Sequence, residues 1–117
     1  MVGESTDKDT RVFMFHAMWF KPDGGAETYQ KYLRKAIPMV ESVGGRKLRS
    51  LEPERALIGE FDADLMFFVE YPSWEAYKRF VSSPEHHKIA YLREGALDNM
   101  ILLKCNRPAN RRPNPNK

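Results

Sequence analysis

Histidine is the residue type in this sequence that titrates nearest to neutral pH, and one of the three histidines lies in the most apolar stretch of the chain. His16 interrupts the run RVFMFHAMWF, residues 11–20. A histidine in such a run is either a core residue satisfied by a neighbour or a general base that faces a pocket. His86 and His87 are consecutive, so on a helix they diverge by about 100° and only one of them can face a given site.

Two arginines and one glutamate are further candidates for chemistry. Arg49 and Arg93 could bind a carboxylate bidentately. The alternative for both is a salt bridge to Glu70 or Glu94. Because Glu70 follows directly on a strongly apolar run, we expect it to be either paired or to have a raised pKa.

These residues predict one site, placed beneath the second helical region of the chain. There, an arginine would hold an acidic or carbonyl oxygen while a histidine exchanges a proton with the substrate. The candidate catalytic residues are His16, His86 and Glu70, and the candidate substrate-binding residues are Arg49, Arg93, Phe68, Trp19 and Trp74. The histidines lack the spacing of metal ligands, so we expect no metal. The sequence has no nucleophile elbow, phosphate-binding loop or nucleotide fingerprint, so we also expect no cofactor.

The first half of the chain predicts a strand, a helix and a second strand. Residues 11–20 are apolar at both odd and even positions, which is typical of a strand covered on both faces. Residues 26–43 have the spacing of an amphipathic helix, which Pro38 should kink or split and which Gly44–Gly45 should end. Residues 46–51 predict an edge strand, which residues 56–60 would extend after a turn or mobile insertion.

The second half predicts a strand, two helices and a last strand. The apolar run 65–71 is stopped by Pro72, and Ser73 is placed to cap the helix that follows. A second Ser-Pro pair, Ser83–Pro84, predicts a break and a new helix with Glu85 in its first turn. Residues 99–105 predict a short final strand.

The resulting β-α-β-β-α-β order indicates an α+β fold, the ferredoxin-like sandwich with a four-stranded antiparallel sheet and its helices on one face. Helices on one face leave the other open, yet the first and third predicted strands are apolar on both. We therefore expect a homodimer in which a second copy of the chain covers the open face, so that the two sheets form a barrel.

Several motifs resemble those of one known family. They are Gly44–Gly45–Arg46, the strand end Tyr71–Pro72–Ser73, the segment Ser83–Pro84–Glu85, and Arg93. From about Phe13 to Cys105 the chain resembles the dimeric α+β barrel superfamily, and within it the family named domain of unknown function 1330. His86 stands where that family usually has tyrosine. The resemblance implies the fold and the dimer. For an enzyme it would imply a cofactor-independent monooxygenase, cyclase or isomerase with a pocket between sheet and helices.

Length and charge define the domain organisation. The 117 residues predict one domain at 11–105, between a disordered N-terminus at 1–10 and a disordered basic tail at 106–117. The net charge of +3 comes mainly from that tail, since it carries Arg107, Arg111, Arg112 and Lys117 and no acidic residue. No apolar run is long enough to span a membrane, and the single cysteine fits a cytoplasmic protein.

Three functions are compatible with this pattern. We favour a protein that binds a small organic or aromatic molecule and could transform it without a cofactor. The alternatives are an RNA-binding module, because RNA-recognition motifs share this element order, and a dimeric scaffold without a ligand. Phe68–Val69–Glu70–Tyr71 matches the end of an RNA-recognition signature, but Asp64, Met66 and Phe67 depart from it, so we do not expect nucleic acid as a partner.

Overall fold

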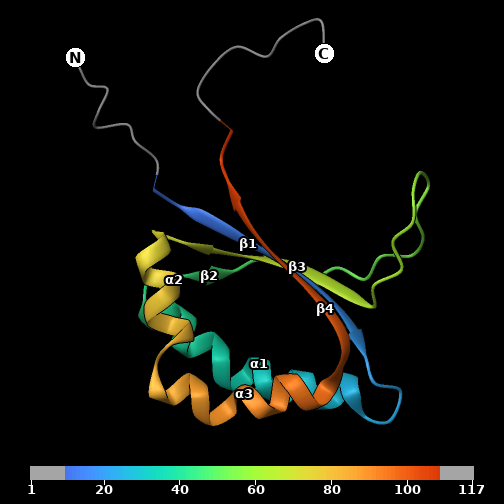
Figure 1. Cartoon of the computed structure of the whole chain (residues 1–117), viewed down its shortest axis with the longest axis horizontal. Helices are drawn as coiled ribbons and strands as arrows, with labels where there is room; N and C mark the ends of the chain where they lie inside the picture. The colour runs from blue at the N-terminus through green and yellow to red at the C-terminus, as the bar shows by residue number, and fades with distance from the viewer. Residues whose placement is uncertain (1–9, 109–117) are drawn as a thin grey trace, which may run out of the picture.

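The fold was analysed in a computed structural model, which describes residues 10–108 (Figure 1). Its elements are β1 (Val12–Phe20), α1 (Gly25–Ser42), β2 (Arg46–Lys47), β3 (Leu65–Tyr71), α2 (Trp74–Val81), α3 (Pro84–Ala96) and β4 (Leu97–Asn106). Nearly all of the predicted disordered N-terminus and most of the predicted tail fall outside the described residues. Asn106, which we had assigned to the tail, is the last residue of β4.

The four strands form one antiparallel sheet in the order β2-β3-β1-β4. The three helices lie together on one side of this sheet (Figure 1). The α+β ferredoxin-like fold predicted from the sequence is therefore confirmed, with the second helical region divided into α2 and α3.

The break between α2 and α3 follows from two serine caps. Ser73 accepts a hydrogen bond from the Ala76 backbone N–H, and Ser83 accepts one from the His86 N–H. Each serine thus satisfies a backbone donor that the first turn of a helix leaves free. Pro84 follows at the first helical position, where its missing N–H costs nothing.

Helix α1 runs through Pro38 as one element, so the predicted split is wrong. Pro38 is exposed and lies on the side of the helix away from the sheet, where water can satisfy the carbonyl that its missing N–H leaves free. The helix ends where Gly44 adopts a φ of 84°. Gly45 follows because a Cβ there would come within 2.7 Å of the Val40 side chain.

Strand β2 is shorter than predicted. Only Arg46 and Lys47 pair regularly with β3, and one further bridge joins Leu51 to Met66. Residues 56–60 do not extend the strand. They belong to an excursion that projects from the sheet on the side away from the helices (Figure 1).

The core lies between the sheet and the helices. Because side chains alternate along a strand, β1 sends Val12, Met14 and Met18 toward the helices, and β3 sends Leu65, Phe67, Val69 and Tyr71. These residues pack against the buried face of α1, which includes Tyr29, Leu33 and Val40.

The opposite face of the sheet is also apolar, as the two-sided pattern of β1 predicts. Phe15 and Phe68 are paired across β1 and β3 with ring centroids 5.2 Å apart, and Phe68 is 39% exposed. On β4, Leu103 pairs with Phe15 and is 49% exposed. No helix of the described residues covers this open face. None of the described helices is long and apolar enough to cross a membrane.

Candidate functional site

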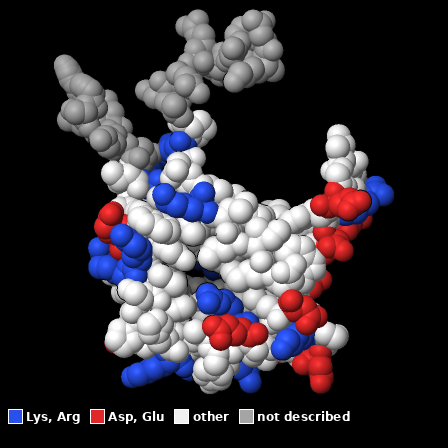
Figure 2. Space-filling view, viewed as in Figure 1, with Lys and Arg blue, Asp and Glu red and all other residues white. Residues whose placement is uncertain are grey.

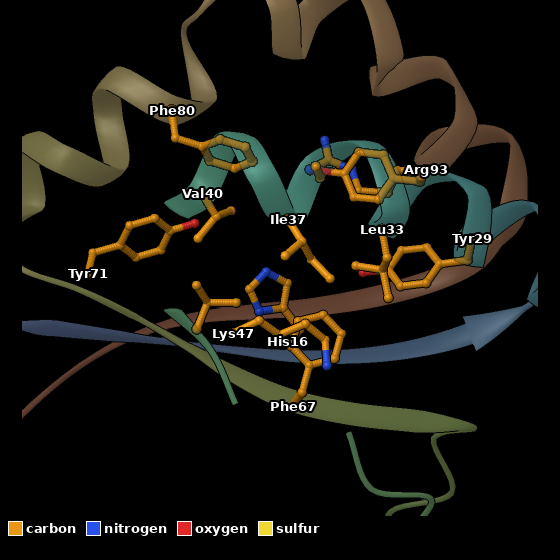
Figure 3. Close-up of a pocket in the computed structure, with 13 residues that line it drawn as sticks. His16, Tyr29, Leu33, Ile37, Val40, Lys47, Phe67, Tyr71, Phe80 and Arg93 are labelled. Atoms are coloured by element: carbon orange, nitrogen blue, oxygen red, sulfur yellow. The ribbon is translucent and has the colours of Figure 1, made fainter. Parts of the chain in front are cut away.

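The candidate site is a narrow cavity between the sheet and the helices (Figure 3). His16 and Phe67 form its floor on adjacent strands, and Lys47 enters from β2. Tyr32 and Ile37 of α1 and Arg93 of α3 lie on its helix side, and the remaining lining is apolar or aromatic: Tyr29, Leu33, Ala36, Val40, Val69, Tyr71 and Phe80. The cavity measures about 30 Å³. That volume holds roughly two or three water-sized groups, so a larger ligand requires the side chains at its edge to move.

His16 presents one nitrogen atom to this cavity. Its Nδ1 lies 3.2 Å from the Met14 carbonyl oxygen, so Nδ1 carries a proton and donates it there. Nε2 is then the acceptor in the neutral ring. The ring stacks on Phe67 at a centroid distance of 4.7 Å. Burial lowers the pKa of His16 to about 4, a shift to which the positive charges of Arg93 and Lys47 contribute and which the Met14 hydrogen bond opposes. His16 is therefore neutral near pH 7, with a free lone pair on Nε2.

Two cationic side chains flank the cavity. The Lys47 Nζ donates to the Leu48 carbonyl and the Ser50 hydroxyl, both neutral, and lies 4.5 Å from the centroid of Phe67. Burial lowers the pKa of Lys47. Arg93 lies 5.8 Å from the ring centroid of Tyr32. Within residues 10–108, neither cation forms an ion pair, so the cavity carries positive charge that no acidic side chain neutralises.

A tyrosine–histidine pair adjoins the cavity from the helix side. The Tyr32 hydroxyl lies 2.8 Å from Nε2 of His86, and His86 is only 2% exposed. Burial raises the pKa of Tyr32, and the nearby Arg93 charge opposes this rise. The pair therefore remains a neutral phenol hydrogen-bonded to imidazole near pH 7.

His86 is held in place mainly by packing. Its ring lies 4.6 Å from Phe80, and its Nδ1 is buried with no hydrogen bond of acceptable geometry among the described residues. Burial lowers the pKa of His86, and Arg93 adds to this effect, while the Val81 carbonyl acts in the opposite direction. A neutral His86 that carries its proton on Nδ1, toward Val81, accepts a hydrogen bond from the Tyr32 hydroxyl at Nε2.

The structure brings together only part of the predicted set of site residues. His16 and Arg93 both line the cavity. His86 is one residue removed from it, in contact with the cavity through Tyr32 and Phe80. The cavity lies mainly against α1, whereas the second helical region, beneath which the site was predicted, contributes only Phe80 and Arg93 to its lining.

Three predicted residues lie on the other face of the sheet, so their assignment to this site is corrected. Glu70 pairs with Phe13 of β1, and because side chains alternate along a strand, Glu70 and His16 lie on opposite faces of the sheet. The Glu70 carboxylate binds Arg11 at 3.2 Å and Arg46 at 3.0 Å. These partners lower the pKa of Glu70, Arg46 first, rather than raising it. Phe68 also lies on the open face, as does Trp19, whose indole N–H donates to Asp62 at 2.8 Å.

Two more predicted residues lie away from the cavity. Trp74 opens α2 and stacks on Tyr77, with the Lys104 Nζ 4.8 Å from its ring. Arg49 follows the two-residue strand β2 and is exposed. Because β2 ends after Lys47, the strand that was to carry Arg49 toward the site does not extend that far.

The sequence analysis missed Lys47 and Tyr32. Lys47 is adjacent to Arg46 in an apparently charged edge segment, and only its pairing with Val69 turns it toward the helices. Tyr32 follows Tyr29 by three residues on the buried side of α1, a spacing that was available in the sequence. Among the described residues, no group of three or more histidine, cysteine or acidic side chains is arranged to hold a metal ion.

Comparison with known proteins places this geometry in a family. The family model described as "Domain of unknown function (DUF1330)" matches residues 24–105. A search of curated proteins gave no significant match. Among solved structures, a protein of unknown function from Rhodopseudomonas palustris is 26% identical, with a TM-score of 0.76 over 89% of this chain and 88% of that one.

Two more distant structures share the fold. A Dabb-family protein with a ferredoxin-like fold from Mesorhizobium loti is 15% identical, with a TM-score of 0.62 over 85% of this chain and 98% of that one. A protein from a Jannaschia species, described as dimeric, ferredoxin-like and of unknown function, is 8% identical, with a TM-score of 0.69 over 82% of this chain and 98% of that one.

Proposed function

The chain belongs to the DUF1330 family, and from this starting point we propose that it binds a small organic anion in the cavity between sheet and helices. The family description assigns no activity, so the proposal depends on the site itself. The observation that carries it is the pair of cations, Lys47 and Arg93, at the edge of an apolar and aromatic cavity without an acidic partner among residues 10–108.

The chemistry of the lining favours an organic anion. A guanidinium and an ammonium group that are partly removed from water bind an anionic or polarised oxygen more strongly than exposed groups do. The aromatic walls would cover the carbon skeleton of the ligand. Within this proposal, Nε2 of neutral His16 accepts a hydrogen bond or a proton from the ligand, and the Tyr32 hydroxyl supplies a second polar contact.

A thermal-shift titration with matched pairs of ligands tests this proposal. Acetate, glyoxylate and benzoate should raise the melting temperature by a few degrees at saturation, whereas acetamide and benzamide should not, because only the anions use both cations. Arg93→Gln and Lys47→Gln should each weaken anion binding at least tenfold. Arg49→Gln, which removes an exposed arginine outside the cavity, is the control and should bind normally. Equal binding of the amides, or no binding of any anion, would contradict the proposal.

We further propose that the protein is a homodimer joined through the open sheet face. The support is the row of aromatic and aliphatic side chains there, including Phe15, Phe68 and Leu103, which no helix of the described residues covers. Sedimentation at micromolar concentration should give the mass of two chains. The cytoplasmic location suggested by the single cysteine stays a prediction.

RNA binding remains the competing function for the same face. Exposed aromatic rings on the open side of a ferredoxin-like sheet can stack on bases. RNA titration at two salt concentrations separates the two cases: salt-dependent RNA binding would favour the nucleic-acid alternative, and a dimer without RNA affinity would favour ours.

A further inference from the structure

The loop between β2 and β3 carries two highly exposed aliphatic side chains at its tip. Leu57 is 83% exposed and Ile58 is 96% exposed, and Gly59 makes the turn beside them with a φ of 81°. We call residues 52–64 the arm. It projects on the side of the sheet away from the helices, at the end where β1 finishes and β3 begins (Figure 1). An isoleucine and a leucine held together in water at the tip of a projection are typical of a contact surface.

The base of the arm is fixed to the open face of the sheet. Phe61 packs against Trp19 and Phe15, with ring centroids 5.9 and 6.5 Å apart. Asp62 accepts a hydrogen bond from the Trp19 indole, and Asp64 accepts one from the Phe20 backbone N–H at 2.9 Å. These contacts make the arm continuous with the face that we propose as the dimer interface, and they hold its tip away from its own subunit.

Charge differs between the two ends of the sheet. The arm contains five acidic residues, Glu52, Glu54, Glu60, Asp62 and Asp64, against one basic residue, Arg55. The other end of the sheet, where β1 begins and β3 and β4 finish, carries Arg11 and Arg46, which both bind Glu70, and Arg107, which lies 5.8 Å from the ring centroid of Phe13. Figure 2 shows acidic side chains on the projecting arm and basic side chains toward the end of the sheet where β1 begins and β4 finishes.

The difference in charge between the two ends of the sheet favours one of the two ways in which two copies can pack face to face. A two-fold axis in the interface and along the strands would place both acidic arms at the same end, where they repel each other. An axis across the strands places the arm of each copy over the basic end of the other. We propose that each arm reaches past the open face onto a second copy of this chain and packs Leu57 and Ile58 against the basic end of that copy's sheet.

Photocrosslinking tests the contact directly, in a Cys105→Ser background that is first shown to keep the wild-type mass. Ile58→Cys is labelled with benzophenone maleimide, and ¹⁵N-labelled and unlabelled chains are mixed before irradiation. We expect crosslinks between subunits to peptides around Arg11 and Arg107. Tyr91→Cys, at a position 67% exposed on α3, is the matched control and should give no such crosslinks.

Affinity provides a second readout. The double variant Leu57→Ser/Ile58→Ser should raise the dimer dissociation constant at least tenfold without changing the circular dichroism spectrum, whereas Tyr91→Ser should leave the constant unchanged. The inference rests on the proposed dimer, and the outcomes separate the two. A dimer with an unchanged constant, and with crosslinks confined to one subunit, would overturn the arm contact alone. A wild-type monomer would overturn the dimer and the arm contact together.

Discussion

The role of His16 depends on the register in which β1 and β3 pair. The sequence identified His16 and Glu70 as polar residues in apolar strands, and both were plausible members of one site. In the sheet, His16 is opposite Phe67 and Glu70 is opposite Phe13, so the two side chains leave the sheet on different faces. A shift of one residue in pairing would reverse this result, and neither strand's sequence fixes the pairing. Residue types were therefore predictable, whereas their convergence was not.

The partly buried His16 predicts a pH dependence of stability. The pKa of His16 is lowered from its ordinary value of 6.5 to about 4 in the folded protein, so the unfolded chain binds a proton first as the pH falls. This contribution to stability is present above about pH 6.5 and is lost progressively toward pH 4, by about 3 kcal/mol.

Urea unfolding of wild type and His16→Gln at pH 7.5 and pH 4.5 measures this effect. The variant should lose less stability than wild type between the two pH values. His87→Gln replaces an exposed histidine and should behave as wild type does. An equal loss in His16→Gln would show that other groups cause the acid sensitivity, with His86 the first candidate because burial lowers its pKa as well.

At the scale of elements, serine, proline and glycine residues predicted most of the points where helices and strands begin and end. Ser73 caps α2 and Ser83 caps α3, as predicted, and the glycine pair after α1 ends that helix. The predicted split at Pro38 is wrong because a proline on the exposed side of a long helix destabilises that helix by less free energy than its packing on the sheet contributes. The arm was predicted only in part: a turn or mobile insertion is expected before residues 56–60, but these residues are expected to extend the strand, and in the structure they pair with no neighbouring strand.

Two glycines predict opposite effects of the same substitution. A Cβ at Gly45 would approach the Val40 side chain to 2.7 Å and the Tyr71 ring to 3.0 Å, whereas a Cβ at Gly95, inside α3, would meet nothing within 4 Å. Gly45→Ala should therefore destabilise the protein by roughly 1–3 kcal/mol through overpacking. Gly95→Ala should stabilise it by about 0.5–1 kcal/mol through helix propensity. Chemical unfolding of both variants measures the difference, and a neutral Gly45→Ala would mean that α1 can shift away from β3.

At the scale of the whole molecule, the sheet is used on both sides for different purposes. One face and the helices enclose a cavity whose two cations form no ion pair within residues 10–108, and the other face presents aromatic rings to the surroundings. The two-sided apolar pattern of β1 predicted this division from the sequence, since a strand with one wet face alternates polar and apolar residues. The positive charge of the cavity was not fully predictable, because Lys47 enters it only through its pairing with Val69.

If two such sheets pack together, unfolding and dissociation occur in one reaction, and the melting temperature depends on protein concentration. For a dimer of this size a hundredfold increase in concentration adds about 2.7 kcal/mol, which corresponds to a rise of about 5 °C. Phe68→Asp places a charge on the open face beside Phe15 and should give a monomer whose melting temperature does not change with concentration. Tyr91→Asp adds the same charge to an exposed position on α3 and should keep the wild-type dependence. Scanning calorimetry from about 1 to 100 µM measures all three proteins, and a wild-type melting temperature that stays constant over this range would exclude a dimer coupled to folding.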